Sequence, residues 1–449
     1  MPQKADILVY CHFSSSRLEY VLDLVLGELL GIKWQLTKNK QDLDRVSCPV
    51  LNYSDEKILG TYQIIPASLL KESHIVNFEP ILSHYGNMPL LFANKKGDFP
   101  FDIFSATFYL VSRYEEYLPY EADKFGRFPA TSSFAWKNGF LDRPIVNEWA
   151  NWLGRELNKR YIGLNVNWRK YEHLITFDID MFFSWKCKGF RRMAGGAVRD
   201  LIALDFRSVF GRVLTVTGMK KDPYDVFDFI FSCLKEVHQK AIFFILTGNY
   251  KSPDNTNLMD RFSVKEKMAE ICSKADVGIH PSVASTNEIP LLRKELNILE
   301  NISGKRTNRS RQHFLKFLIP ETYRVILLHG ITEDYSMGFA DRPGFRAGIA
   351  APFYFFDLLR DEKTRLRVYP LALMDRTFVS YMHLTNDEIL SEMRFIRQTV
   401  KENHGMLVSL WHNITLADDR HGRKWQGIFH RFLLTEEMNP NVHRIRMEE

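Results

Sequence analysis

Short apolar runs alternate with amphipathic segments in the C-terminal part of the chain, from about residue 170 onward. Between two of these runs, "DVFDFIFSCLKEVHQKA" carries apolar residues at helical spacing, with one stripe made of Val226, Ile230, Cys233 and Val237. Apolar runs that alternate with amphipathic helices predict a βα-repeating domain with a mainly parallel sheet. The predicted strands are "LITFDID", "KAIFFILTGN", "DVGIHPS", "YRVILLHG", "RVYPLALMD" and "MLVSLWHN".

A second amphipathic helix is predicted over "LTNDEILSEMRFIRQTVKENHG". Thr385 with Glu388 three residues later is a capping-box pattern that predicts the start of this helix, and Gly405 predicts its end. Its apolar stripe consists of Ile389, Met393, Ile396 and Val400. Start and stop signals around one periodic segment therefore support a helix between the last two predicted strands.

The first 170 residues have a different texture. They open with a strand-like run, "ADILVYCHF", followed by "RLEYVLDLVLGELLG", whose apolar positions recur at helical spacing and which ends at Gly31. Further along, "PFDIFSATFYLVSRYEEYLP" is aromatic and helix-like, and the apolar "IVNEWANWLGREL" closes this half. We therefore predict two domains, a smaller α/β domain over residues 1–170 and a second domain over residues 171–449.

Composition and charge fit this two-domain prediction and exclude several classes of protein. The chain has 449 residues, and its 45% of apolar residues are enough for well-packed cores. The 60 basic and 54 acidic residues give a net charge of only +6, well short of a nucleic-acid-binding protein. No apolar run is long enough to span a membrane and the start lacks a signal peptide, so we expect a soluble, cytoplasmic protein.

The cysteines form an odd, scattered set without a CxxC pair. This pattern favours free thiols in a reducing compartment and argues against a zinc site made of cysteines. They are Cys11, Cys48, Cys187, Cys233 and Cys272.

The run "HLITFDIDMFF" places two carboxylates, Asp178 and Asp180, in an otherwise strongly apolar stretch. Residues two apart in a strand point the same way, so both carboxylates share one face while Phe177 and Ile179 face the other. Two like charges this close need a compensating partner, which could be a metal ion, an arginine or a shared proton.

Other predicted strands also end in reactive side chains. "DVGI" is followed by His280, "YPLALM" by Asp375, and "LVSLW" by His412. Arg309, Arg311 and His313 lie in "NRSRQHF", and Asp334 follows "VILLHGITE". Because functional residues collect at the carboxyl ends of parallel strands, we expect these groups to converge on one rim. Carboxylates, imidazoles and guanidiniums together can hold a divalent metal and carry out acid–base chemistry.

At these residues the sequence resembles the polysaccharide deacetylases with a NodB-homology domain, also called carbohydrate esterase family 4. The resemblance is carried by "TFDID", "GIHPSVAS", "RSRQHF" and "LWHN", and it covers about residues 170–420. The order of "SRQHFLKF", "EDYSMGFADRPGFRAG" and "SLWHN" is similar to a bacterial branch that carries its own N-terminal domain and is linked to surface-polysaccharide gene clusters. The family implies an α/β fold with a distorted or incomplete (β/α) barrel of the NodB type.

The resemblance also implies catalytic roles. Asp178 would be the base that takes a proton from a metal-activated water, and Arg311 would hold its carboxylate ionised. His412 would be the acid that protonates the departing amine or alkoxide. The candidate substrate contacts are Ser285, Asp334 and Arg346, of which the last could instead pair with a nearby acid.

For the metal, the resemblance implies a divalent ion with zinc as the expected choice. Asp180 and His280 match two of the family's ligands. The family has a second histidine four residues after the first, and this chain has Ala284 there. Either the third ligand comes from elsewhere, with His313 as the best candidate, or the metal is bound weakly or is absent.

The function that the resemblance implies is removal of acetyl groups from a sugar or a surface-polysaccharide precursor, which could be carried on a lipid. This would be a hydrolase of carbon–nitrogen bonds other than peptide bonds. A barrel that has lost its metal and binds glycan without cleaving it is the alternative from a non-enzyme class. A glycosyltransferase with a metal-binding Asp-X-Asp pair is less favoured, because it leaves His280 and His412 unexplained. In a dehalogenase-like phosphatase, Thr or Val would be expected where Phe182 stands.

The segment "SWKCKGFRRMAGGAVRDLIALDFRSVFGRVLTVTGMKK" contains nine Lys or Arg residues against two acidic residues, with apolar residues between them. It could be a lid over the sugar or a surface that meets anionic lipid headgroups. We favour a solvated amphipathic helix packed on the barrel.

Overall fold

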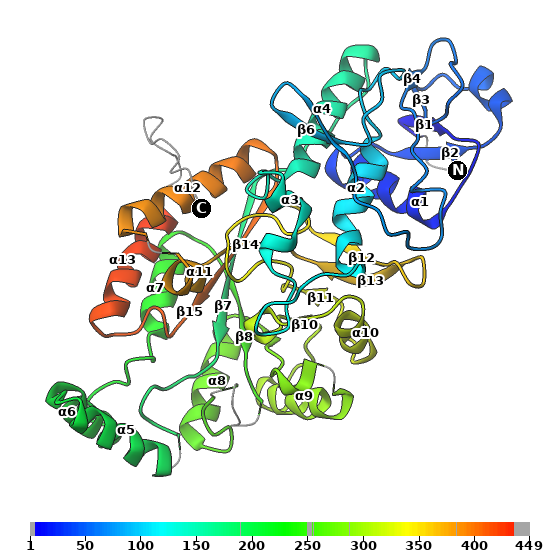
Figure 1. Cartoon of the computed structure of the whole chain (residues 1–449). Helices are drawn as coiled ribbons and strands as arrows, with labels where there is room; N and C mark the ends of the chain where they lie inside the picture. The colour runs from blue at the N-terminus through cyan, green and yellow to red at the C-terminus, as the bar shows by residue number, and fades with distance from the viewer. Residues whose placement is uncertain are drawn as a thin grey trace.

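The computed structural model describes residues 5–188, 190–248, 254, 256–286, 288–382 and 384–434. The chain begins with a parallel four-stranded sheet of order β2-β1-β3-β4 (Figure 1). A helix, α1 (Ser16–Leu22), follows the first strand and continues as a π-helical segment over Asp23–Leu29. The strand and the helix predicted at the start are therefore confirmed. The strands are β1 (Ile7–Tyr10), β2 (Trp34–Thr37), β3 (Val50–Asn52) and β4 (Tyr62–Gln63).

The two helix-like segments predicted later in this part are α2 (Ile103–Val111) and α4 (Ile145–Arg160). All residues of α2 are buried, and the side chain of Asp102 accepts hydrogen bonds from the first free backbone N–H groups of this helix. A short helix and an antiparallel hairpin complete this part: α3 (Phe134–Lys137), β5 (Leu82–Tyr85) and β6 (Met88–Leu91).

Residues from 172 onward form a nine-stranded sheet that curls into half a barrel (Figure 1). Its order is β12-β13-β11-β10-β9-β8-β7-β15-β14, and only the pair β12 and β13 is antiparallel. This mixed α/β sheet agrees with the expected distorted or incomplete barrel. The strands are β7 (Glu172–Ile179), β8 (Ala241–Ile245), β9 (Asp276–Ile279), β10 (Arg309–Ser310), β11 (Glu333–Asp334), β12 (Phe353–Asp357), β13 (Glu362–Val368), β14 (Leu371–Met374) and β15 (Met406–His412).

The register of the central strands brings their carboxyl ends to one edge. Asp178 of β7 lies opposite His412 of β15 on one side and Phe244 of β8 on the other. Further along the sheet, Ile279 of β9 lies opposite Ser310 of β10. Residues that follow β7, β9 and β10 therefore meet the end of β15 at the same rim.

Aromatic side chains attach helices to the face of the sheet opposite the two carboxylates. Phe177 stacks on Phe243 of the neighbouring strand, with ring centroids 5.0 Å apart. Phe429 of α13 (Arg420–Leu434) contacts Phe177 and Trp411 edge-on. Burial of these rings fixes which face β7 turns toward the helices, and therefore which face carries Asp178.

The amphipathic helices are largely where the sequence predicts them. The helix with the capping-box pattern is α12 (Asn386–Glu402), and both hydrogen bonds of the box, between Thr385 and Glu388, are present. Within the described part of the chain, no helix combines the length and apolar character needed to cross a membrane. The remaining helices are α7 (Phe227–Glu236), α8 (Phe262–Lys274), α9 (Ile289–Ser303), α10 (Glu321–Leu328) and α11 (Asp375–Ser380).

Two of the predicted strands differ in the structure. "YRVILLHG" is helical and forms most of α10, because its buried residues Tyr323 and Ile326 lie three apart while Leu328 is exposed. "RVYPLALMD" is divided into β13 and β14, which lie far apart in the sheet order. The break falls at Pro370, which has no N–H to donate to a neighbouring strand.

The basic segment after β7 forms two helices, α5 (Phe190–Ile202) and α6 (Phe206–Val216), that pack on each other. Figure 1 shows this helical hairpin at the periphery of the molecule, beyond α7 and α8. The single helix packed on the barrel that we favoured from the sequence is therefore not what the structure shows. We call this element, residues 190–216, the α5–α6 hairpin.

Candidate functional site

A cavity of about 300 Å³ opens at the rim where β7, β9 and β15 end. Its walls combine charged side chains from the strand ends with apolar and aromatic side chains of neighbouring residues, such as Met181, Phe314 and, within β15, Leu410. The structure therefore brings the candidate strand-end groups together in one concave place. The ionisable residues of the lining are Arg127, Asp178, Asp180, His280, His313, Arg376, Tyr381 and His412.

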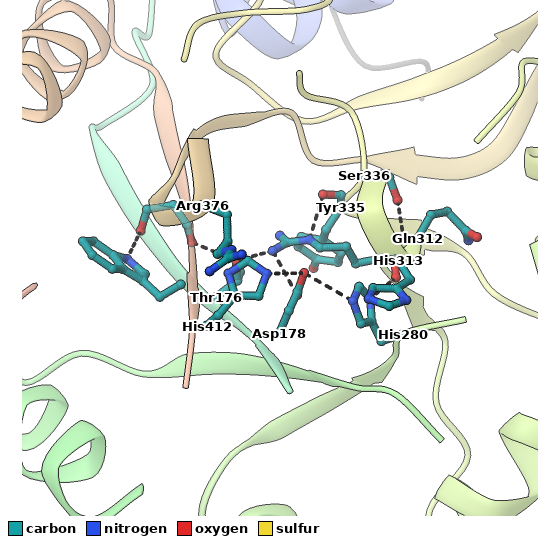
Figure 2. A network of polar contacts seen from close by, with 12 residues as sticks. Thr176, Asp178, His280, Gln312, His313, Tyr335, Ser336, Arg376 and His412 are labelled. Atoms are coloured by element: carbon teal, nitrogen blue, oxygen red, sulfur yellow. Dashed lines mark hydrogen bonds and ion pairs between the residues drawn. The ribbon is translucent and has the colours of Figure 1, made fainter. Parts of the chain in front are cut away.

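The Asp178 carboxylate lies at the centre of a buried polar network (Figure 2). Figure 2 shows it between the imidazoles of His412 and His280, whose Nε2 atoms lie 3.9 Å and 3.6 Å from Asp178 Oδ2. Arg311 Nη1 lies 3.4 Å from Asp178 Oδ1 and donates to Thr176 Oγ1 at 2.8 Å. An ionised Asp178 thus has a fixed cation beside it, as the sequence suggested.

Arg311 is held behind the cavity rather than in its lining. Its side chain is fully buried, its Nε donates to the Tyr335 carbonyl at 3.0 Å, and its guanidinium lies 4.8 Å above the Phe244 ring. Burial lowers the pKa of Arg311, although the charge of Asp178 opposes this shift. Hydrogen bonds from Nε and Nη1 hold the guanidinium in this place beside the Asp178 carboxylate.

Asp180, His280 and His313 form a group with the composition of a metal site. One ligand atom from each lies within 4.8 Å of the other two. His280 Nδ1 hydrogen-bonds to the Arg311 carbonyl and His313 Nδ1 to the Asp254 carboxylate, both at 2.6 Å. Both imidazoles therefore turn Nε2 toward Asp180, with Nε2 to Oδ1 distances of 3.4 Å and 3.7 Å.

Two of these inward atoms are buried without a hydrogen-bond partner, His280 Nε2 and Asp180 Oδ1. Buried polar atoms without partners are rare, and here they point at a common centre. Burial alone would raise the pKa of Asp180, but its contact with His280 and the charges of His313 and His412 lower it, so the carboxylate is ionised. One carboxylate and two imidazoles whose outer nitrogens are already bonded fit a divalent metal with an open position.

His412 forms a buried pair with Asp375 on the other side of Asp178. The His412 backbone N–H donates to Asp375 Oδ2 at 2.8 Å, and His412 Nδ1 lies 2.7 Å from Asp375 Oδ1. Burial lowers the pKa of His412, but the charge of Asp375 and the hydrogen bond to it outweigh burial and raise the pKa to about 9. His412 is therefore protonated at neutral pH, with Nε2 facing Asp178.

Ser285 and Asp334, two of the three candidate substrate contacts, lie outside the cavity lining. The Ser285 hydroxyl donates to the Ser282 carbonyl at 3.0 Å and to the Glu295 carboxylate at 2.9 Å. The buried Asp334 carboxylate accepts hydrogen bonds from Ser310 and Ser336, and burial raises its pKa. Both side chains are thus hydrogen-bonded to neighbouring residues of the protein, outside the cavity lining.

Arg346, the third candidate substrate contact, pairs with an acid instead, which was the open alternative from the sequence. Its guanidinium donates two hydrogen bonds to the buried Glu116 carboxylate, from Nε at 2.9 Å and from Nη2 at 2.6 Å. Arg113 Nε also donates to Glu116, at 2.7 Å, and Arg113 Nη1 donates to the Arg346 carbonyl. This buried cluster joins the first part of the chain to the nine-stranded part.

Glu116 pairs with two buried guanidiniums, of which Arg113 also pairs with Glu115 while Arg346, among the described residues, pairs with Glu116 alone, so we expect Glu116→Gln to lower the free energy of unfolding by about 2–3 kcal/mol. Urea denaturation followed by circular dichroism measures this loss. Glu156→Gln is the matched control, since Glu156 pairs with exposed Lys159, and it should change stability by less than about 1 kcal/mol. Equal losses in both variants would show that the buried cluster contributes no more than a surface pair.

Several residues at the site were not found from the sequence. Asp254 orients His313 but lies in a loop without any motif, and Arg127 reaches the cavity from the first part of the chain. Arg127 donates to the Phe314 carbonyl at 2.8 Å and pairs with Asp123. Asp375 had a signal, because it ends a predicted strand, but the sequence gave no reason to assign it a role. Long-range placement of this kind has no local pattern that could have revealed it.

Comparisons with known proteins give the following matches. Residues 7–162 match the model of a family described as a family of unknown function, DUF7033. No curated protein matches the sequence. Among solved structures, a Mycobacterium smegmatis protein assigned by its description to the polysaccharide deacetylases shares 14% identity and a TM-score of 0.39, with 61% of this chain and 88% of that chain covered.

Two further solved structures are from Bacillus. The polysaccharide deacetylase from Bacillus cereus shares 14% identity and a TM-score of 0.30, with 59% of this chain and 86% of that chain covered. A carbohydrate esterase family 4 pseudoenzyme from Bacillus anthracis shares 11% identity and a TM-score of 0.29, covering 59% of this chain and 60% of that chain. With TM-scores this low, these likenesses carry no argument, and the functional proposal rests on the residues of the cavity and on the sequence motifs that resemble the polysaccharide deacetylases.

Proposed function

We propose that this protein is a metal-dependent hydrolase that removes acetyl groups from a sugar or a polysaccharide precursor. The observation that carries this proposal is one cavity in which three open ligand atoms, of Asp180, His280 and His313, lie beside a separate carboxylate and a buried imidazole–carboxylate pair. A structural metal site would need no such neighbours, whereas hydrolysis of an amide or ester needs a metal, a base and an acid together.

The metal would be held by Asp180 and by Nε2 of His280 and of His313. Bound there, a divalent ion such as zinc supplies Lewis-acid chemistry, polarising an acyl carbonyl and lowering the pKa of a water molecule from about 15.7 toward about 7. Histidine and carboxylate ligands suit zinc, and the mixture excludes neither manganese nor cobalt. The Arg311 carbonyl and the Asp254 carboxylate keep both imidazoles in the tautomer that can bind.

Asp178 is the base in this proposal. Water attacks the acyl carbon while Asp178 takes one of its protons, and Arg311 with Thr176 keeps the carboxylate in place. The order of charges along the network fits this role, because Asp178 lies between the cation Arg311 and the protonated His412. A carboxylate in that position can accept a proton from a water molecule in the cavity.

His412 is the acid. It enters the reaction protonated, and Nε2 can deliver that proton to the sugar nitrogen or oxygen as its bond to the acyl carbon breaks. Acetate and the free amine or hydroxyl are then the products. The buried Asp375 stabilises the charged imidazole and holds its ring through the contact with Nδ1, as a carboxylate does in a catalytic triad.

The experiment that tests the proposal combines metal analysis of the purified protein with acetate release from acetylated amino sugars. We expect about one metal ion per chain and acetate release in the wild type, and loss of both in Asp180→Ala. A wild-type protein that holds no metal and releases no acetate would favour the alternative, a barrel that binds glycan without cleaving it.

The pair of His412 and Asp375 leads to a prediction about pH. An acid whose pKa is raised to about 9 stays protonated up to that pH, so activity should fall as the pH rises through about 9. In Asp375→Asn the carboxylate charge is lost while burial remains, so the pKa of His412 falls. We expect the pH at which kcat/KM falls on the alkaline side to be lower by about one pH unit or more than in the wild type.

A pH profile of acetate release for both proteins measures this shift. Asp357→Asn is a control, because Asp357 is a buried carboxylate that pairs with Arg324 outside the cavity lining. A slower Asp375→Asn enzyme with an unmoved alkaline limb would mean that Asp375 only positions the imidazole.

A further inference from the structure

The α5–α6 hairpin is a built element of the fold. Its helices are joined by an ion pair between Arg212 Nη2 and Asp200 Oδ2 at 2.5 Å, and the Arg212 guanidinium lies 5.5 Å above the Trp185 ring. Gly211 lets Trp185 approach, since a Cβ on that glycine would lie 3.0 Å from the ring. These contacts join the two helices to each other and α6 to Trp185.

That outer surface is strongly apolar. Six large apolar side chains of the two helices are between 53% and 78% exposed: Val198, Leu201, Ile202, Phe206, Phe210 and Val213. Those of α5 are spaced by three and one residues, and those of α6 by four and three, so each helix presents one apolar stripe. Leu204 between the helices and Met219 after them are also exposed. Contiguous apolar surface of this kind marks a place where something binds.

The charge of the segment identifies the partner. Residues 184–221 carry nine Lys or Arg residues and two acidic residues, Asp200 and Asp205. Both acids are used inside the hairpin, because Asp200 pairs with Arg212 and Asp205 caps the start of α6. Lys220 and Lys221 at its end are exposed. Exposed apolar stripes in a segment whose sequence has this excess of basic residues match an anionic lipid surface, whereas the core of a protein interface is depleted of charge.

We propose that the α5–α6 hairpin docks on an anionic membrane surface, with its apolar stripes in the headgroup region. The hairpin is the next helical element after β7, the strand that carries Asp178, and Met181 in the connection that begins after β7 lines the cavity. Docking would therefore hold this edge of the cavity near the membrane. Membrane binding is independent of the proposed function. The further step, that the docked protein acts on a lipid-linked sugar, rests on the proposed function.

The test is sedimentation of the full chain with vesicles of phosphatidylcholine that contain phosphatidylglycerol, and with vesicles of phosphatidylcholine alone. We expect binding to the first that weakens as salt is added, and none to the second. In the triple variant Leu201→Gln, Ile202→Gln and Phe210→Gln, the vesicle affinity should fall about tenfold or more. Glutamine keeps the helices, and all three side chains are exposed, so folding should be unaffected.

A matched control variant carries Leu59→Gln, Ile162→Gln and Leu328→Gln, which also replace exposed apolar side chains but lie outside the hairpin. It should bind vesicles as the wild type does. Binding of the hairpin variant at wild-type strength, or no binding of the wild type, overturns the proposal. So does a wild-type dimer in light scattering that the hairpin variant abolishes, since a second copy would then cover the stripes. Acetate release from a soluble sugar should be equal in all three proteins, so a failure of docking and a failure of the proposed reaction give different results.

Discussion

Replacing Asp178 by Asn is expected to lower the rate of acetate release by about 1000-fold while leaving the bound metal in place. An amide has the shape of the carboxylate but cannot accept the proton from water, and loss of a general base typically costs about 100-fold to 10,000-fold in rate. Asp178 is not among the three side chains whose ligand atoms share a centre, so the metal should stay. Single-turnover acetate release and metal analysis of the same preparation measure both effects.

Asp334→Asn is the matched control for this prediction. Asp334 is also a buried carboxylate of the nine-stranded sheet, but its oxygens accept from Ser310 and Ser336, away from the cavity. We expect its acetate release to stay within a few-fold of the wild type, because Asp334 lies outside the cavity lining. An active Asp178→Asn enzyme would remove Asp178 as the base, and an inactive one that has also lost its metal would make it a ligand instead.

The fold was predictable where periodicity and chain order were enough. Apolar runs that end in Asp178, Ile279 and His412 are strands because both of their faces are covered, and the parallel order follows from the helices between them. The prediction of a strand over "YRVILLHG" was wrong, because a short apolar run fits a strand and a buried helix equally well. The tertiary contacts of Tyr323 and Ile326 decide between them, and those contacts are long-range.

The site was predictable at the strand ends and not between them. Asp178, Asp180, His280 and His412 end strands of one parallel sheet, so their meeting follows from topology. Topology does not predict which polar side chains near the rim point into the cavity. Their direction depends on hydrogen-bond partners that lie far away in the sequence. Ser285 turns to Glu295 and Arg346 to Glu116, whereas Arg127 comes in from the other part of the chain.

Replacing His313 by Ala is expected to weaken metal binding by more than about 100-fold. Loss of a partner that only orients a ligand typically costs about 10-fold to 100-fold in metal affinity, and loss of the ligand itself should cost more. Asp254→Asn, which removes only the carboxylate charge that holds His313 Nδ1, should therefore fall between the wild type and His313→Ala. Competition with a chromogenic chelator measures the three affinities, and His329→Ala, outside the cavity lining, is a control that should leave the affinity unchanged.

This series of variants tests whether His313 takes the place of the second histidine that the sequence resemblance implies. Ala284 is exposed and lies outside the cavity lining, whereas the His313 ring lies 4.9 Å from the His280 ring and turns Nε2 toward Asp180. The histidine that completes a metal site can lie at different sequence positions in different proteins, because coordination depends only on which ligand atoms lie around the metal. If His313→Ala keeps stoichiometric metal at wild-type affinity, the third ligand lies elsewhere. The hypothesis that His313 is the third ligand is then wrong. If the affinity falls and added imidazole restores it, the vacant place is the one His313 fills.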